Sequence, residues 1–589
     1  MNQLRTRGWM ATHVVLGFAT VVFATPGGAQ EMPDSGGAHH DMHHDAALPG
    51  PEPRLGSITF VTSANPAAHR AFIRGMLFMH NFHYPQAAAA FREAQTLDPG
   101  DVMSYWGEAV SYTHPVWNQQ DTAAARAVLR RLAPTAAARL AKARTKRERA
   151  WLATAEALYD ADVSKARHDT LFSTSLASLR AAYPADVDAQ LFYALSLLGL
   201  NQGDRDVPTY LRAYAIARRV FAAHPNHPGA AHYMIHAVDD PAHASLGLDA
   251  ARAYSRIAPD ASHAQHMTSH IFIALGMWDD VIAANVRAQH PPKPGAHVTY
   301  GHGVQWLAYG YLQEGRYAEA AGWVDSMRVQ TVRFAKGSDD SRDAELESRS
   351  HLVFDRAAYV ADTREWRSPP AMLAIDTASL GVHELAANDL ALGLGALGRG
   401  EPARADSILA RLDSRMAQPH ASADDEIASE RGYAEVIAKV LHAVVMHARG
   451  EGEKAVAMLV AAAAQDDALP FAFGPPVEIV SPHELAGEYL LELRRAKEAE
   501  REYKLELARA PGRTAALIGL ATAQLELEQR ADARRTYLHA AKNLAGADGA
   551  AMPAIAALRA RLDAPRERRE ADDGPPARKA SKAPGDSTS

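Results

Sequence analysis

Apolar residues recur at intervals of three and four along most of this 589-residue chain. Between about residue 64 and residue 545, Ala, Leu, Arg and Glu dominate the sequence, and Pro, Gly and Asp interrupt it at short intervals. A spacing of three and four residues places apolar side chains on one face of an α-helix, and the interruptions mark helix ends. The pattern predicts an all-α protein made of many short amphipathic helices.

The helical region repeats itself with a period of 34 residues. Small and aromatic residues take the same positions in separate units, as at Gly75, Ala87 and Phe91 and again at Gly487, Ala499 and Tyr503. Small residues let the two helices of a unit approach closely, while the aromatic residue fills the space between them. This spacing resembles that of the tetratricopeptide repeat, a helix–turn–helix unit that stacks into a solenoid, or superhelix.

The resemblance divides the helical region into two runs of repeats. We expect N-terminal repeats in residues 64–327 and C-terminal repeats in residues 371–545. Between them, residues 328–370 break the period, for example at Lys336-Gly-Ser-Asp-Asp, which predicts an irregular insertion. Residues 464–483 also break the period and are expected to form a loop that lines or caps a groove.

The first 29 residues have the layout of a secretory signal peptide. Arg5 and Arg7 precede an apolar run over residues 9–23, and small residues follow up to Ala29. A short apolar run between a basic start and a small-residue cleavage site is typical of export. No later stretch reaches the length of about 18 apolar residues that a membrane helix needs. We therefore expect an exported protein, periplasmic or secreted, without a membrane span.

The stretches on either side of the helical region lack an apolar period. Residues 565–589, charged and containing Pro, Gly and Ser, are expected to be disordered. Residues 30–63 form a predicted flexible tail with four closely spaced histidines, His39, His40, His43 and His44. Such a tail suits either weak capture of Cu(II), Zn(II) or Ni(II) or an inert linker, and the sequence leaves both open.

The amino-acid composition excludes several kinds of functional site. The chain has no Cys beside 28 His, which excludes disulfides, thiol catalysis, Cys-ligated zinc and Cys-bound iron–sulfur clusters. With 62 Lys and Arg against 69 Asp and Glu, the net charge of −7 offers no electrostatic footprint for nucleic acid. Any metal chemistry must therefore use His and carboxylate ligands.

Eleven of the 28 histidines lie in residues 224–302. Among them are two pairs, His232 with His236 and His266 with His270. The members of each pair are four residues apart, so they share one helix face. The two pairs are offset by 34 residues, which is one repeat, so they occupy the same two positions of neighbouring units.

The resemblance to the tetratricopeptide repeat implies that positions 2, 5 and 9 of each first helix face a concave groove. The two pairs fall at positions 5 and 9 of their units. The candidate metal ligands are His232, His236, His266 and His270, with His263, His302, Asp239 and Asp240 as further candidates. Two further candidate groove residues are Gln305 and Tyr309.

Three interpretations of this histidine cluster stay open at the level of sequence. Imidazoles on neighbouring helices can supply three or four ligands to Zn, Cu, Ni or Fe, the metals suited to these donors. The same side chains can hydrogen-bond a ligand, or bind an anion when protonated. They can also pack between helices as a structural feature that was duplicated with the repeat.

Longer strings carry a second resemblance. HPGAAHYMIHAVDDP (227–241) and HAQHMTSHIF (263–272), together with Phe78-Met-His80-Asn-Phe82-His83, resemble a histidine-rich group of exported bacterial tetratricopeptide repeat proteins. The resemblance covers most of residues 67–290. It implies the repeat fold and export, and it implies no particular reaction.

Standard enzyme motifs are missing from the sequence. His483-Glu484 begins like a zinc-protease motif, but Gly487 stands where the second His is required. The sequence therefore favours a non-enzymatic scaffold that holds a protein, peptide or small ligand in a concave histidine-rich groove. The alternative is a metal-binding or metal-dependent protein that uses the histidine pairs on adjacent repeat helices.

Overall fold

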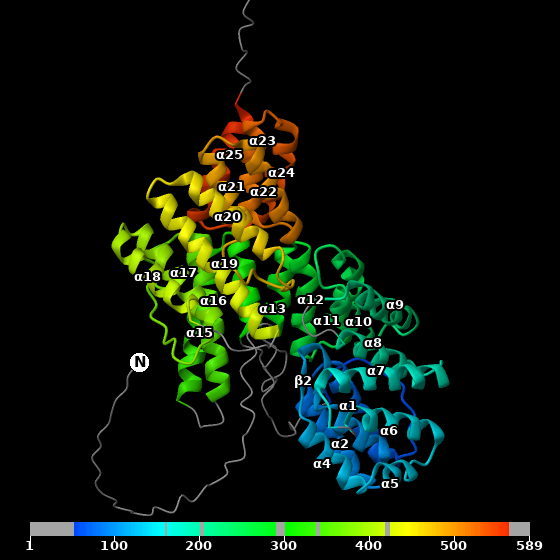
Figure 1. Cartoon of the computed structure of the whole chain (residues 1–589). Coiled ribbons are helices and arrows are strands. Elements are labelled where there is room, and N and C mark those ends of the chain that lie inside the picture. The colour runs from blue at the N-terminus through cyan, green and yellow to red at the C-terminus, as the bar shows by residue number, and fades with distance from the viewer. Residues whose placement is uncertain are drawn as a thin grey trace, which may run out of the picture. The chain divides into compact units, whose positions relative to one another are not determined.

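The computed structural model describes residues 52–159, 162–200, 205–289, 301–336, 342–418 and 425–564. Within them the chain is almost entirely helical, and the predicted all-α fold is confirmed (Figure 1). The predicted signal peptide, the four tail histidines and residues 565–589 lie outside the described residues. None of the described helices combines the length and the apolar character needed to cross a membrane.

The N-terminal helices begin directly after a polar residue, as the interruptions in the apolar pattern predict. Asn65 caps the first helix by accepting from the backbone N–H groups of Ala67 and Ala68, and Asp101 caps the third in the same way. The elements are α1 (Pro66–His80), α2 (Tyr84–Leu97), α3 (Val102–Val110), β1 (Thr113–His114), η1 (Pro115–Trp117), β2 (Gln119–Gln120), α4 (Thr122–Leu132), α5 (Ala136–Ala141), α6 (Lys146–Tyr159), α7 (Lys165–Ala182), α8 (Val187–Leu198) and α9 (Val207–Ala223). The strands β1 and β2 pair antiparallel as a short hairpin.

The middle and C-terminal helices follow without further strands in the described residues. The middle elements are α10 (Pro228–Ala237), η2 (Ala244–Gly247), α11 (Leu248–Ile257), α12 (Ser262–Ala274), α13 (Trp278–Gln289), α14 (His302–Gln313), α15 (Tyr317–Ala335) and α16 (Arg342–Thr363). The C-terminal elements are α17 (Val382–Gly398), α18 (Pro402–Met416), α19 (Asp425–Ala448), α20 (Gly452–Asp466), α21 (Pro482–Glu492), α22 (Ala496–Arg509), α23 (Thr514–Glu526), α24 (Arg530–Asn543), η4 (Leu544–Gly546), η5 (Gly549–Ala551) and α25 (Met552–Asp563).

Consecutive helices pack in pairs like those of tetratricopeptide repeats, for example α1 on α2, α12 on α13 and α23 on α24 (Figure 1). Gly75 in α1 faces Phe91 in α2 so closely that a Cβ atom on Gly75 would lie 2.6 Å from the Phe91 ring. Gly487 in α21 meets the ring of Tyr503 in α22 in the same way, at 2.8 Å. The predicted close approach of small and aromatic positions is therefore confirmed in both units.

Residues 328–370 differ from the irregular insertion that the broken period predicts. They contain the end of α15 and all of α16. Residues 337–341, which carry the turn-forming sequence after Lys336, lie outside the described residues, and Pro369-Pro370 lies beyond the end of α16. Residues 467–481, between α20 and α21, do form a helix-free connection, as the broken period predicts.

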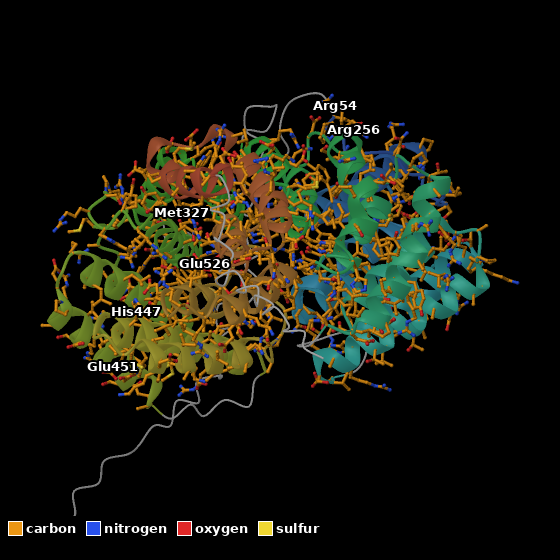
Figure 2. The ribbon with its side chains drawn as sticks, turned by 90° about the horizontal axis from the view of Figure 1, so that it is seen from above. Arg54, Arg256, Met327, His447, Glu451 and Glu526 are labelled. Atoms are coloured by element: carbon orange, nitrogen blue, oxygen red, sulfur yellow. The ribbon has the colours of Figure 1, made fainter. Side chains whose placement is uncertain are left out.

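The predicted flexible tail over residues 30–63 also differs from the structure in its last part. Leu55 and Phe60 are buried in the same core as α1 and α10. Arg54, labelled in Figure 2, donates from Nη2 to a carboxylate oxygen of Asp260, just after α11, at 2.9 Å. The tail prediction missed this anchoring because the four apolar residues of this stretch, Leu55, Ile58, Phe60 and Val61, do not follow a helical period.

The C-terminal helices contact the middle of the chain. Trp278, at the start of α13, donates from Nε1 to the Gly512 carbonyl at 3.0 Å. Thr514, at the start of α23, donates from Oγ1 to the carbonyl of Gln313, the last residue of α14, at 2.6 Å. The start of α23 is therefore held against α13 and α14, which lie beside the histidine-bearing helix α12.

Candidate metal centre

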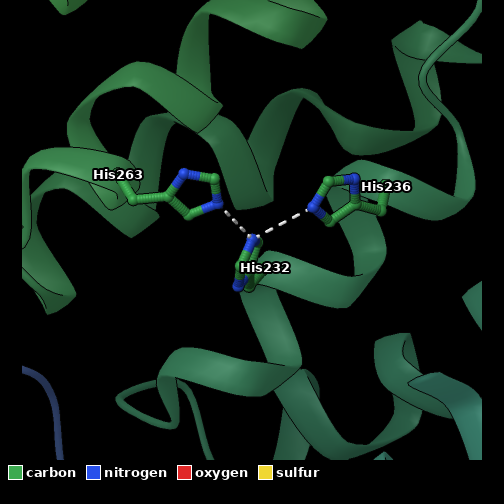
Figure 3. Close-up of side chains that lie close together, drawn as sticks. All are labelled: His232, His236 and His263. Carbon is green, nitrogen blue, oxygen red and sulfur yellow. Dashed lines mark hydrogen bonds between the residues drawn. The ribbon is translucent and has the colours of Figure 1, made fainter. Parts of the chain in front are cut away.

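Three histidines from two first helices converge on one point. His232 and His236 lie one turn apart on α10, and His263 lies in the first turn of α12. The Nε2 atom of His232 is 3.1 Å from Nε2 of His236 and 3.2 Å from Nε2 of His263 (Figure 3). All three side chains are buried. We call these three residues the first triad.

The same arrangement recurs one repeat later. His266 and His270 lie one turn apart on α12, and His302 is the first residue of α14. The Nε2 atom of His266 is 3.2 Å from Nε2 of His270 and 2.7 Å from Nε2 of His302. We call these residues the second triad. Each triad thus combines a pair on one first helix with a histidine from the first turn of the next first helix.

The two triads are neighbours. The ring centroids of His236 and His270 are 6.1 Å apart, and those of His263 and His266 are 6.5 Å apart. Within each triad the three nitrogens lie within 4.8 Å of one another. A tetrahedral ion about 2.0–2.1 Å from each nitrogen separates its ligands by roughly 3.3 Å, so the spacings within the triads are close to those of a metal site.

Hydrogen bonds fix which nitrogen carries the proton in the second triad. The Nδ1–H of His270 donates to Asp239 Oδ2 at 2.5 Å. The Nδ1 of His266 faces Asn285 Oδ1 at 2.7 Å, and the Asn285 amide donates its own N–H to the Val281 carbonyl, so Oδ1 must be the acceptor. A neutral imidazole protonated at Nδ1 has its lone pair on Nε2. The Nε2 lone pairs of His266 and His270 therefore face each other at 3.2 Å.

Two facing lone pairs repel unless a hydrogen-bond donor or a positive centre satisfies them. The Nε2–H of a neutral His302, 2.7 Å from His266 Nε2, can serve one of the two, which leaves the lone pair of His270. A proton could satisfy that lone pair if one ring became an imidazolium. However, burial lowers the pKa of His266 to about 3, and repulsion from His270 adds to this effect. A metal cation satisfies both nitrogens without protonating either, and a metal-bound histidine usually donates its other N–H to an acceptor such as Asn285 or Asp239.

The first triad is prepared in a similar way. The Nδ1–H of His232 donates to the backbone carbonyl of His80 at 2.8 Å, which leaves the Nε2 lone pair directed at the other two imidazoles. Burial lowers the pKa of His232 to about 3, so this ring is neutral at neutral pH. A neutral imidazole is the form that binds metals.

Aromatic rings cover both triads. The Phe82 ring lies against all three imidazoles of the first triad, with its centroid 4.2 Å from that of His232. The Trp306 ring covers the second triad in the same way, at 4.3 Å from His270. Phe82 is fully buried and has a φ of 57°, an uncommon conformation for a bulky residue. These rings cover most of the two triads and lower the local dielectric constant, while His302 stays half-buried.

The remaining candidates take other roles. Asp239 supports His270 from behind. Asp240 pairs with Arg205 at 3.1 Å and with His243 at 2.8 Å, and it belongs to neither triad. Two candidate groove residues likewise have partners within the fold: Gln305 Oε1 lies 3.2 Å from His351 Nδ1, and the Tyr309 hydroxyl accepts from Arg513 at 2.9 Å.

The triads do not form an exposed groove wall. His232 is 0% exposed, and His266 and His270 are 1% exposed. The resemblance-based expectation of outward-facing positions 2, 5 and 9 therefore differs from the structure here. The covering rings of Phe82 and Trp306 come from a turn after α1 and from α14, so packing by neighbouring elements encloses positions that an open solenoid would expose.

One further buried group was not predicted. His80, Asp188 and His227 also bring potential ligand atoms within 4.8 Å of one another. His80 is held by the Tyr233 hydroxyl at Nδ1 and by Asp188 at Nε2, both at 2.9 Å. Because its carbonyl accepts from His232, this group positions the first triad. Asp188 lies on α8, 44 residues before His232, and no repeat spacing connects it to the pairs.

Comparisons with known proteins add little beyond the fold. No protein-family model matches the chain, and no curated protein matches it either. Among solved structures, the chain is similar to the Cut9–Hcn1 hetero-tetramer of the APC/C, with 10% identity, a TM-score of 0.30 and coverage of 84% of this chain and 76% of that one. The human IFIT1 dimer with m7Gppp-AAAA is 11% identical, with a TM-score of 0.30 and coverage of 82% of this chain and 91% of that one. Yeast Tom70 is 12% identical, with a TM-score of 0.27 and coverage of 84% of this chain and 95% of that one. Likenesses this distant carry no argument about what the chain binds.

Proposed function

We propose that this protein binds transition-metal ions in two adjacent three-histidine sites, the first and the second triad. The observation that carries the proposal is the pair of Nε2 lone pairs of His266 and His270, which face each other at 3.2 Å while Asn285 and Asp239 hold both Nδ1 protons. The first triad supports it independently with the same spacing and with a fixed Nδ1–H on His232.

The donor set limits the metal. Imidazole nitrogen suits Zn, Cu, Ni and Fe, whereas Mg and Ca prefer oxygen ligands. With three nitrogen ligands, a tetrahedral ion keeps one position for water or a small ligand. We therefore propose Zn, Cu, Ni or Fe as the bound ion.

Two expectations from the sequence stay part of the proposal. Export to the periplasm or the medium is supported by the pattern of residues 1–29 alone. The repeat fold supports a protein or peptide partner in a concave groove. The buried triads would not contact such a partner. The metal sites and such a partner surface are compatible, because they would use different side chains.

Thermal unfolding with and without chelator tests the metal proposal. A ligand that binds the folded state raises its stability, so a metal present at 100 times its Kd adds about 2.7 kcal/mol. We expect the Tm of zinc-loaded protein to fall when EDTA is added, and to respond about half as much in His270→Ala. A Tm that is the same with zinc and with EDTA would refute the proposal.

The four tail histidines could bind zinc weakly and must be removed from the comparison. Replacing His39, His40, His43 and His44 by Ala gives a background without tail histidines, which we call the tail-free background. In it, only the folded region can change its stability when zinc binds. His224→Ala serves as a matched control, because it removes an exposed histidine that belongs to neither triad.

A further inference from the structure

A small cavity lies directly behind the second triad. Its volume is ≈ 70 Å³, enough for a few water molecules, since one water needs about 10–15 Å³ of such space. Asp239 lines it on the side of the triad, and the helix-free connection over residues 467–481 and α22 line it on the other. The cavity therefore joins the metal site to the C-terminal helices.

Asp239 connects the cavity to the metal ligands. Its Oδ2 accepts from His270, while its Oδ1 is buried and has no hydrogen-bond partner. The residue is 2% exposed. A buried carboxylate oxygen without a partner is costly, and it calls for water or a cation in the adjoining cavity.

Three more carboxyl groups line the same cavity: Asp466, Glu478 and Glu506. Burial, followed by repulsion from Glu478, raises the pKa of Asp466 to about 7. Burial, followed by repulsion from Glu484, raises the pKa of Glu506 to about 7. Carboxyl groups crowded in this way gain stability when a cation enters between them.

Basic side chains do not fully neutralise the four carboxyl groups that line the cavity. Among the described residues that line the cavity, Arg509 is the one basic side chain. Its guanidinium is bound to Asp466 at 2.8 Å and to Asp467 at 2.9 Å. Outside the lining, Arg513 lies 3.9 Å from Glu506, and His270 donates to Asp239. Four carboxyl groups thus share two guanidinium groups, an excess of acidic groups that attracts cations.

The cavity reaches the surface next to the second triad. Phe471 and Phe473, in the helix-free connection, line it and are each 37% exposed. The Phe473 ring lies 6.3 Å from the ring of His270. Among the described residues, the lining includes four carboxyl groups and none of the second triad's histidines, so a cation inside the cavity would contact carboxylates first.

We propose that this cavity is the entry site of the second triad: a divalent transition-metal cation binds first to its carboxylates and then passes to His266, His270 and His302. The inference rests on the proposed function. The carboxylates suit transit and not retention, because in the described residues they form no set of three ligand atoms within 4.8 Å, and these metals prefer imidazole to carboxylate. The entering cation displaces the protons that the carboxyl groups hold, and these protons leave to solvent.

Stopped-flow loading of the full chain with Co²⁺ tests the inference. In the tail-free background, His236→Ala leaves the second triad as the loading site. We expect Glu478→Gln with Glu506→Gln to slow its loading at least tenfold, with unchanged Co²⁺ content at equilibrium. Glu498→Gln, an exposed acid on α22, should leave the rate unchanged.

The failures of the two proposals are distinguishable. Equal loading rates with and without Glu478 and Glu506 would overturn the entry site while metal binding stands. No Co²⁺ uptake by the chain with both triads intact would overturn the proposed function itself. A folding defect is detected in the His270→Ala background, where the first triad should load at the same rate whether or not the two carboxylates are present.

Discussion

His232, His266 and His270 each donate their Nδ1–H to a fixed acceptor of a different kind: a backbone carbonyl, an amide oxygen and a carboxylate. At the residue scale this common feature matters more than the number of histidines. It sets one tautomer on three rings and leaves three Nε2 lone pairs for a cation. A histidine cluster that only filled space would not need the same nitrogen free each time.

The substitution Asp239→Asn should lower the metal affinity of the second triad only. The carboxylate orients His270 and raises its basicity, and loss of such a partner costs 10- to 100-fold in metal affinity. We expect zinc affinity of the second triad to fall by about that factor while the first triad is unchanged. Competition titration with a zinc chelator measures the zinc affinity of each triad. An equal loss at both triads, or none at either, would contradict this role.

The buried neutral histidines predict acid sensitivity of the metal-free protein. The pKa values of His232 and His266 are about 3 in the folded state and about 6.5 in the unfolded chain. Below pH 6.5 the unfolded state therefore binds protons that the folded state does not, and the free energy of unfolding falls by about 1.4 kcal/mol per pH unit for each histidine. The loss continues down to about pH 3.

Urea unfolding in EDTA at pH 7 and pH 5 checks this slope. The difference between the two pH values should shrink by about 2 kcal/mol in His232→Gln and again in His266→Gln. His224→Gln, at an exposed position, should leave the difference unchanged. A difference in unfolding free energy that is the same in all variants would show that these rings are not the acid-sensitive groups.

The residue types were predictable only in part. The sequence identified both pairs from their 34-residue offset and named His263 and His302, which are 39 residues apart, as further candidate ligands. Asn285 and the carbonyl of His80, which fix two of the tautomers, carried no signal. Each reaches its histidine through packing between different helices. Neither lies at a repeated spacing that one sequence can reveal.

At the element scale, the site follows from duplication of one helix. α10 and α12 carry a histidine pair at the same two positions, and the first turn of the next first helix completes each triad. The series ends at α14, where Gln305 and Tyr309 replace the pair and bind His351 and Arg513 instead. The 34-residue offset between the pairs predicted the duplication, but it does not predict the enclosure by Phe82, after α1, and Trp306, on α14.

Close helix pairing depends on glycine at particular positions. A Cβ on Gly107 in α3 would lie 2.5 Å from the Phe91 ring, whereas a Cβ on Gly322 in α15 would meet nothing within 4 Å. We expect Gly107→Ala to destabilise the protein by about 1–3 kcal/mol through overpacking, and Gly322→Ala to stabilise it by about 0.5–1 kcal/mol through helix propensity. Thermal unfolding measures both, and a stable Gly107→Ala variant would contradict the packing.

At the scale of the whole molecule, contacts between distant segments enclose the second triad. Residues 467–481 bring Phe473 to His270, and the start of α23 is bound to α13 and α14. These contacts join residues more than 200 positions apart and leave no local sequence pattern. The sequence therefore predicted the stacking of helices but not the burial of their histidine face.

Gly512→Ala should loosen this enclosure. Gly512 has a φ of +76°, and a Cβ there would lie 2.9 Å from Gly276 Cα. We expect a loss of about 1–3 kcal/mol in stability and several-fold faster zinc release from the second triad, followed with a chromogenic chelator. Release from the first triad should not change. Gly400→Ala is the matched control, since its φ is +77° and a Cβ there would have no neighbour within 4 Å.

We propose that each triad binds one metal ion. The most direct test is the zinc content of the full chain in the tail-free background, after saturation with zinc and removal of free metal. We expect two zinc ions per chain, one in His236→Ala, one in His270→Ala and none in the combined variant. A metal-free parent chain, or two ions retained in the combined variant, would contradict it.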